Sequence, residues 1–157
     1  MKFKIVVIGI MILLLGACGD KSYEPVTINS ETDTCDMCSM GIQDKQSSAQ
    51  IIEEDGTPKK FDDIGCLVTF MQENIEEQAE AYVRDHRSSE WVNMETSYFI
   101  QSTDIVSPMS YGIIAFTTEI DALEWHQEHG GNIYSKDELL SEDMKDLKMG
   151  TAETHIH

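Results

Sequence analysis

The chain has 157 residues, of which 41% are hydrophobic and 25% charged, and it carries 29 Asp+Glu against 11 Lys+Arg. This length allows one domain of ordinary size or two very small ones, and it excludes a large multidomain enzyme. The formal net charge of −18 argues against binding to nucleic acid, so we expect cations or basic proteins as partners. A simpler explanation of the charge is that an acidic surface keeps the protein soluble.

The N-terminus has the organisation of an export signal. Lys2 and Lys4 precede an apolar run at 5–15, which is shorter than the roughly 20 residues that a membrane-spanning helix needs. The run leads into Leu-Gly-Ala-Cys ending at Cys18, which resembles the lipobox of bacterial lipoproteins, where the cysteine becomes the first mature residue and is acylated. We therefore expect residues 1–17 to be a signal peptide and a lipid on Cys18 to hold the protein at the extracytoplasmic face of the cell membrane.

The polar segment that follows Cys18 has no sustained hydrophobic period. Residues 18–34 are interpreted as a tether between the membrane and a folded metal-binding domain at 35–157. Inside that domain the pattern indicates two sub-units, at about 35–80 and 81–150. A flexible tail, residues 151–157, is expected to follow them.

The first half of the domain has the pattern of a hairpin followed by a helix. Apolar and polar side chains alternate weakly along residues 48–54, an Asp-Gly-Thr-Pro turn follows, and residues 59–61 resume extended structure. This pattern predicts a β-hairpin. Either Asp62 or Asp63 then caps a helix. The apolar positions of this helix recur at spacings of three and four, at Ile64, Leu67, Val68, Met71 and Ile75.

The second half repeats the order strand, strand, helix. In chain order we expect a strand at 81–86 and a short amphipathic helix or a turn at 91–98, followed by paired strands at 99–103 and 113–117. A helix from Thr118 through Glu128, a short strand at 132–134 and an acidic helix at 136–147 complete the second half. Thr118 and Asp121 predict a capping box, and Gly130 and Gly131 end the helix. The predicted fold is therefore α+β, with two small ββα-like units in tandem after the lipidated tether.

Three cysteines remain beyond Cys18, which is an odd number for an oxidising compartment. They are Cys35, Cys38 and Cys66, so at least one thiol is free, bound to a metal or paired with another molecule. Cys35 and Cys38 form a C-x-x-C pair, with Met37 between them and Met40 just after. Two thiols and two thioethers thus fall within six residues.

Three chemistries use a C-x-x-C pair. A redox dithiol closes a small disulfide ring, usually at the start of a helix that lowers one thiol pKa. A zinc site aims two thiolates at one tetrahedral ion and needs a further pair of Cys or His ligands. A Cu(I) site uses thiolate and thioether ligands because soft sulfur suits a soft ion. The neighbouring methionines favour Cu(I), although Met37 or Met40 could also be core residues.

Other cysteine and histidine positions are secondary candidates. Cys66 lies in the first turn of the predicted helix, where a cysteine is usually a small buried hydrophobe; the alternative is a third thiol that faces the C-x-x-C pair. His155 and His157 could capture copper or zinc, although a disordered tail is the simpler interpretation. Three further histidines are interpreted as structural or surface residues: His86, His126 and His129.

Four sequence blocks follow the lipobox in a recognisable order. They are Cys-Asp-Met-Cys-Ser-Met at 35–40, Phe-Asp-Asp-Ile-Gly-Cys-Leu at 61–67, Ser-Pro-Met-Ser-Tyr-Gly at 107–112 and Gly-Gly at 130–131. This order resembles the NosL family, lipoproteins that are similar to copper chaperones for nitrous oxide reductase. The family usually has glycine where this chain has Ser39 and Ser110, and threonine where it has Ser107.

The resemblance implies a fold of paired ββα domains and a function in copper handling. It implies that Cys35, Cys38, Met40 and Met109 contact Cu(I), and that the protein delivers copper outside the cytoplasm to a copper enzyme such as nitrous oxide reductase or to its assembly complex. No catalytic role is expected, because the sequence has no nucleophile motif, phosphate-binding loop or paired acid and base. The alternatives are a membrane-tethered thiol-disulfide oxidoreductase that uses the C-x-x-C pair and a zinc-stabilised binding lipoprotein.

Overall fold

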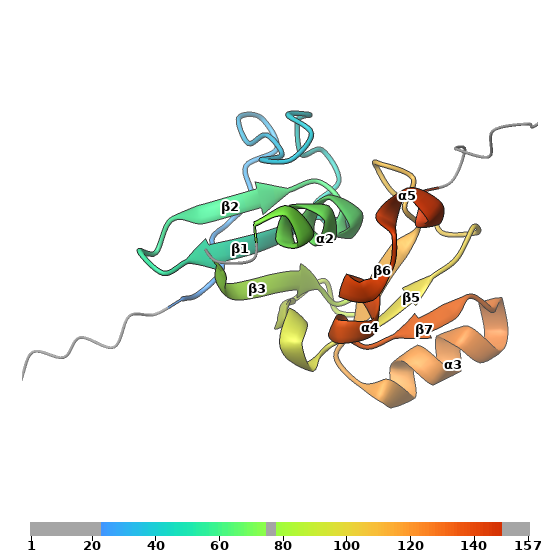
Figure 1. Cartoon of the computed structure of the whole chain (residues 1–157). Helices are drawn as coiled ribbons and strands as arrows, with labels where there is room; N and C mark the ends of the chain where they lie inside the picture. Colours follow the sequence, from blue (N-terminus) through green and yellow to red (C-terminus); the bar gives the residue numbers. More distant parts are fainter. Residues whose placement is uncertain (1–22, 75–77, 149–157) are drawn as a thin grey trace, which may run out of the picture.

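The computed structural model of the chain describes residues 23–74 and 78–148. Two antiparallel sheets lie beside one another, the first with one helix packed against it and the second with two (Figure 1). The predicted signal peptide, Cys18, His155 and His157 lie outside the described residues. Within the described ranges, no helix has both the length and the apolar character needed to cross a bilayer.

The first unit is a four-stranded sheet with one helix. Its elements are β1 (Ala49–Glu53), β2 (Pro58–Phe61), α2 (Ile64–Glu73), β3 (Gln78–Arg84) and β4 (Trp91–Asn93). The predicted hairpin is confirmed as the antiparallel pair of β1 and β2, and β3 pairs with the other edge of β1, giving the order β2-β1-β3-β4. The helix α2 packs against β1 and β2.

The second unit repeats this arrangement with three strands. A 3-10 turn, η2 (Met94–Thr96), leads into β5 (Tyr98–Gln101), β6 (Ile113–Phe116), α3 (Glu119–His129) and β7 (Asn132–Tyr134), followed by α4 (Lys136–Ser141) and α5 (Met144–Leu147). The sheet order is β6-β5-β7, so the first strand of each unit lies between its hairpin partner and the strand that follows the helix. Both units thus contain strand, strand, helix, strand in chain order, and the first unit adds β4 at its edge.

These observations confirm the predicted α+β class and the repeated strand, strand, helix order. The strand β3 crosses the approximate division predicted near residue 80, because it pairs with β1 and completes the first sheet. The boundary instead follows β4. The sequence suggested a new unit at this point because a strand after a helix is also what the start of a second repeat would show.

Two predicted helices take a different form in the structure. The segment predicted as a short helix or turn at 91–98 contains the edge strand β4 and the short turn η2. The acidic helix predicted at 136–147 is two short helices, because Glu142 has extended backbone and Asp143 caps α5 through the N–H of Lys145. Ser135 caps α4 and Asp143 caps α5, so the segment forms two helices where its hydrophobic period predicted one.

The described part of the predicted tether, residues 23–34, lies against the first sheet. The Gln50 side chain donates to the Val26 carbonyl at 2.6 Å and accepts from the Val26 N–H at 3.0 Å, and Ile28 is buried. Because side chains alternate along a strand, Gln50 and Ile52 lie on the face of β1 opposite to Ile51. Residues 23–34 therefore cover the back of the sheet and belong to the folded domain.

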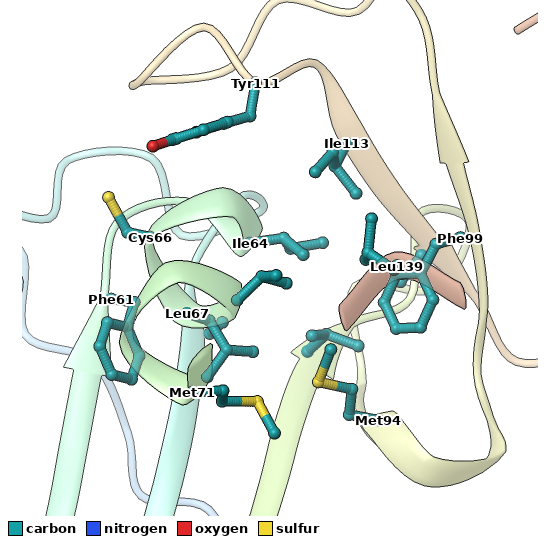
Figure 2. Packing of buried hydrophobic residues seen from close by; sticks show 14 of the residues in the cluster. Phe61, Ile64, Cys66, Leu67, Met71, Met94, Phe99, Tyr111, Ile113 and Leu139 are labelled. Atoms are coloured by element: carbon teal, nitrogen blue, oxygen red, sulfur yellow. The ribbon is translucent and has the colours of Figure 1, made fainter. Parts of the chain in front are cut away.

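The two units share one core and a polar junction. Phe99, Ile113 and Leu139 from the second unit pack in the same cluster as Ile64 and Leu67 from α2 (Figure 2). At the junction, the Asp85 carboxylate after β3 accepts hydrogen bonds from the backbone and the hydroxyl of Thr117, at 2.8 and 2.9 Å. Burial opposes ionisation of Asp85, but its hydrogen bonds to Ser88 and Thr117 outweigh burial and lower its pKa to about 2. The units therefore form one body.

The start of α2 is packed tightly against the second unit. The Tyr111 ring lies across the first turn of α2, on the side of Cys66 (Figure 2). A Cβ atom added to Gly65 would lie 2.1 Å from two ring carbons of Tyr111, well inside van der Waals contact. Glycine at 65 is therefore what allows the ring to seat on the helix.

Gly65→Ala should accordingly destabilise the protein by about 2 kcal/mol, because the ring would have to move from a well-packed position. Urea unfolding of the reduced protein measures the effect. Gly41→Ala is the matched control, since its new Cβ would meet only the Gln43 amide nitrogen at 3.4 Å. Equal stability of the two variants would contradict the packing described for Tyr111.

Candidate metal centre

Four side chains from three segments converge beside the first turn of α2. The thiols of Cys35, Cys38 and Cys66 and a carboxylate oxygen of Asp62 all lie within 4.8 Å of one another, and all three thiols are free. Cys35, Asp62 and Cys66 are 2 to 3% exposed, whereas Cys38 is half-buried. The cluster is therefore a buried group that reaches the surface at Cys38.

The C-x-x-C pair lies in a tight loop before β1. The loop is closed by a bridge between Thr34 and Gly41 and by a 2.8 Å hydrogen bond from the Cys35 N–H to the Met40 carbonyl. Asp36 fixes the loop to β2, where its N–H donates to the Lys60 carbonyl and its carboxylate accepts from the Lys60 N–H. The thiols thus lie in a turn beside a strand rather than at the start of a helix.

The adjacent residues Asp62 and Asp63 have different roles. The Asp63 carboxylate caps α2 by accepting from the Gly65 N–H at 2.7 Å. The Asp62 carboxylate faces the cluster instead, and the Cys38 thiol lies 3.5 and 3.6 Å from its two oxygens. Asp62 was not predicted as a site residue from the sequence. The available signal was the Asp-Asp pair itself, because only one of two adjacent residues can occupy the N-cap.

Asp63 also connects the cap of α2 to the loop between β5 and β6. Its second oxygen accepts from the Ser107 hydroxyl at 2.6 Å and from the Met109 N–H at 3.0 Å. The Ser107 hydroxyl in turn accepts from the Gly112 N–H at 3.0 Å. The loop that carries Met109 is thereby held at the same helix terminus as the cysteine cluster.

The structure separates the predicted sulfur contacts into two groups. Cys35 and Cys38 meet each other and are joined by Cys66, the residue that we interpreted mainly as a buried hydrophobe. Met40 is 53% exposed at the outer side of the loop, and Met109 is partly buried against the main core. Cys66 therefore lies in the cluster with the C-x-x-C pair, and a role of Met40 and Met109 as metal contacts stays a prediction.

The thiols of the cluster differ strongly in acidity. A hydrogen bond from Cys66, together with backbone N–H groups that include that of Cys38, lowers the pKa of Cys35 to about 6 in spite of its burial. Burial, with the neighbouring Cys35 and Asp62, raises the pKa of Cys38 to about 11. The hydrogen bond to Cys35, together with burial, raises the pKa of Cys66. One thiolate is thus already present near neutral pH, beside two protonated thiols.

Three histidines lie elsewhere. His86 makes edge-on ring contacts with Phe116 and Trp125, and His129 packs on Trp125. The Nδ1 atom of His126 is buried without a hydrogen-bond partner among the described residues. These contacts agree with the structural or surface roles that we predicted for all three.

Two serines in the loops adopt backbone conformations that glycine adopts more easily. Ser39 has φ 63° and Ser110 has φ 62°, both in the left-handed region. These are the positions where the NosL resemblance leads us to expect glycine. Both loops therefore have a glycine-like conformation despite the substitutions, at a strain of about 1 kcal/mol for each residue.

The fold and the cluster define a small α+β protein with a thiol-rich site suited to a metal ion. The sequence matches the NosL family model over residues 25–144, so the chain belongs to the NosL family. The fold is similar to that of the crystal structure of the copper chaperone NosL from Shewanella denitrificans, with a TM-score of 0.66 and 22% identity, covering 74% of this chain and 96% of that one. No curated protein sequence matches significantly.

Replacing the strained serines should stabilise the protein. Ser39→Gly and Ser110→Gly should each raise the free energy of unfolding by about 0.5 to 1 kcal/mol, because relief of the left-handed strain exceeds the added entropy of the unfolded chain. Ser30→Gly, in a turn without positive φ, is the control and should lower stability slightly. Urea unfolding compares them; destabilisation by both loop changes would show that the hydroxyls matter more than the strain.

The Cys35 thiolate should be visible in the reduced, metal-free protein. Absorbance at about 240 nm, the usual thiolate signal, should rise near pH 6 in the wild type. The midpoint of this rise should move to higher pH in Cys66→Ala, which lacks the hydrogen bond to Cys35, and the rise near pH 6 should be absent in Cys35→Ser. Because folding lowers this pKa, the contribution of Cys35 to stability is present above the ordinary thiol pKa and is lost as the pH falls through about 6. Titration of all three thiols above pH 8 would contradict the assignment.

Proposed function

We propose that this protein is a Cu(I)-binding metallochaperone, in which Cys35, Cys38 and Cys66 hold the ion. The observation that supports this is the convergence of three free thiols within 4.8 Å at one helix terminus. Three thiolates suit a soft ion that accepts a low coordination number. Family membership supports copper as the cargo, because the structurally similar NosL from Shewanella denitrificans is a copper chaperone.

Asp62 gives a specific reason to keep zinc as a second candidate. Three thiolates and one carboxylate can supply the tetrahedral set that Zn(II) prefers. A Cu(I) ion held by three sulfurs would not need the oxygen ligand. Loss of the Asp62 carboxylate should therefore weaken Zn(II) binding more than Cu(I) binding, and this difference distinguishes the two candidate metals.

The thiol-disulfide oxidoreductase alternative has less support. A redox C-x-x-C pair usually begins a helix, whose N-terminus stabilises the thiolate. Here the pair lies in a turn before β1, and Cys35 is stabilised by Cys66 and by local N–H groups. A third thiol and a carboxylate in contact with the pair fit metal ligation better than disulfide exchange.

Release of the ion would take place through the exposed side of the site. Cys38 is the half-buried thiol of the three, and Met40 lies two residues away with about half of its surface exposed. An acceptor sulfur or imidazole can approach Cu(I) past Cys38 while Cys35 and Cys66 still hold it. In this proposal Met40 and Met109 are weak thioether contacts that assist exchange, as the family resemblance implies.

We further propose that Cys18 anchors the protein by acylation at the outer face of the cell membrane. Copper would be delivered there to a copper enzyme such as nitrous oxide reductase or to its assembly complex. The support is the lipobox-like sequence before Cys18 and the short apolar run that precedes it. A membrane-held chaperone would find a membrane-associated assembly complex by diffusion in two dimensions.

Competition with a Cu(I) chelator tests the ligand assignment. Wild-type protein should bind about one Cu(I), and serine at 35, 38 or 66 should weaken binding by about 100-fold, or about 2.8 kcal/mol. Met109→Leu should change affinity by less than about tenfold, because it keeps the volume of the side chain and removes only a weak contact. Thermal unfolding of the metal-free variants separates lost ligation from lost folding.

The same titration with Zn(II) separates the two metals. Asp62→Asn should weaken Zn(II) binding and leave Cu(I) binding within about threefold of the wild type, if Cu(I) is held by sulfur alone. Tight Zn(II) binding with no uptake of Cu(I) by the wild type would refute the chaperone proposal.

Membrane fractionation tests the anchor. The wild type should sediment with membranes, whereas Cys18→Ser should be released or left uncleaved, since acyl chains supply about 0.8 kcal/mol for each buried CH₂. Cu(I) affinity should be unchanged, because the folded domain begins after the anchor. Wild-type protein found entirely in the soluble fraction would rule out the lipid anchor.

A further inference from the structure

The two loops beside the thiol cluster expose large apolar side chains at the surface. Five large apolar side chains of the described residues are substantially exposed, and two of them are Met40, at 53%, and Val106, at 92%. Met40 ends the cysteine loop, and Val106 directly precedes Ser107, which is bonded to the Asp63 cap. Both loops thus present an exposed apolar side chain near the opening of the site.

The charges in the same loops have one sign. Residues 29–44 and 102–112 contain no lysine or arginine. They carry exposed carboxylates at Glu31, Asp36, Asp44 and Asp104. On β2, Lys60 is paired with Asp33 at 2.7 Å and Lys59 with Glu53 at 3.9 Å. Lys148 is the cation beside the second loop, where it lies 5.2 Å from the centroid of the Tyr111 ring, so the carboxylates of the two loops outnumber the cations next to them.

The two loops lie at the same end of the molecule (Figure 1). Cys35 and Cys38 bring the first loop to Cys66 and Asp62, and Asp63 brings the second loop to the adjacent position. The contacts at the start of α2 therefore fix their arrangement. An exposed valine in a firmly held loop has no packing role within the domain, but it can be buried against a second protein.

We propose that the surface formed by residues 29–44 and 102–112 is the docking face for the copper acceptor. The partner that fits is a protein whose copper-receiving site is surrounded by lysine and arginine, with an apolar recess for Met40 and Val106. Opposite charge would steer the encounter and orient the two sites, while apolar contact would exclude water during ligand exchange. This inference rests on the proposed chaperone function and adds the chemistry of the partner.

The test measures transfer of Cu(I) from the full mature chain to synthetic peptides. Two acceptor peptides share the same Cys-x-x-Cys ligands and a leucine, but one is flanked by lysines and the other by glutamates. Stopped-flow measurement should show transfer to the lysine peptide about tenfold faster at low salt, and the advantage should shrink at high salt because exposed charges are screened. Equal rates for the two peptides would overturn the docking inference.

Surface variants test whether the two loops cause the faster transfer to the lysine peptide. Glu31→Gln with Asp104→Asn should remove most of the lysine advantage, because both carboxylates are exposed and neither holds the cysteine loop. Val106→Gln should slow transfer to both peptides. The matched controls are on α3, away from these loops: Glu119→Gln with Glu128→Gln, and Ile120→Gln, where Ile120 is 69% exposed. They should transfer as the wild type does, and equal slowing by the controls would overturn the inference.

Chelator titration distinguishes failure of the docking inference from failure of the proposed function. Every variant named for this test should bind Cu(I) as tightly as the wild type, because none removes a candidate ligand. Normal affinity with equal transfer to both peptides refutes the docking face alone. A wild-type protein that does not bind Cu(I) refutes the chaperone proposal and the docking face with it.

Discussion

The N-cap of α2 is the interaction on which the rest of the site depends. The Asp63 carboxylate accepts from the Gly65 N–H, from the Ser107 hydroxyl and from the Met109 N–H. It therefore begins the helix and joins it to a loop of the second unit. Burial raises the pKa of Asp63, and these hydrogen bonds oppose that effect. A buried carboxylate with fewer donors would be unfavourable, so the cap and the loop support each other.

Because Asp63 is the N-cap, the side chains of Asp62 and Cys66 both face the cysteine loop. Asp62 is turned towards the cysteine loop, and Cys66, three residues beyond the cap, reaches the same point from the helix. Tyr111 covers this turn of α2, and glycine at 65 leaves room for its ring. The cluster is therefore assembled by a helix start and a turn before β1, and the loop between β5 and β6 is held beside it by Asp63.

Local pattern was sufficient to predict most of the fold. The β1–β2 hairpin, the strand pair β5–β6 and the helix α3 with its Thr118 cap follow from period, turn residues and capping signals, all of which act over a few residues. The place of β3 could not be predicted in this way. Its partner is chosen by the hydrophobic face of β1, more than twenty residues earlier in the chain.

The candidate site was predictable in part for the same reason. The C-x-x-C pair is a local signal, so Cys35 and Cys38 were evident from the sequence. Cys66 and Asp62 join them only through the position of α2 on the sheet, and a cysteine in a helix turn has the same appearance whether it fills a core or binds a metal. The family resemblance led us to expect glycine at 39 and 110, and the left-handed serines show that the loop conformation is kept without it.

In the proposed site, three thiolates, including the one on α2, hold the copper ion. X-ray absorption at the copper edge of the Cu(I)-loaded protein tests it most directly, because it counts the sulfur atoms bound to the metal. We expect three sulfur neighbours in the wild type, two in Cys66→Ala, and three in the double variant Met40→Leu with Met109→Leu. A count that is unchanged in Cys66→Ala but falls in the double leucine variant would contradict it, and would assign copper to the C-x-x-C pair and the methionines.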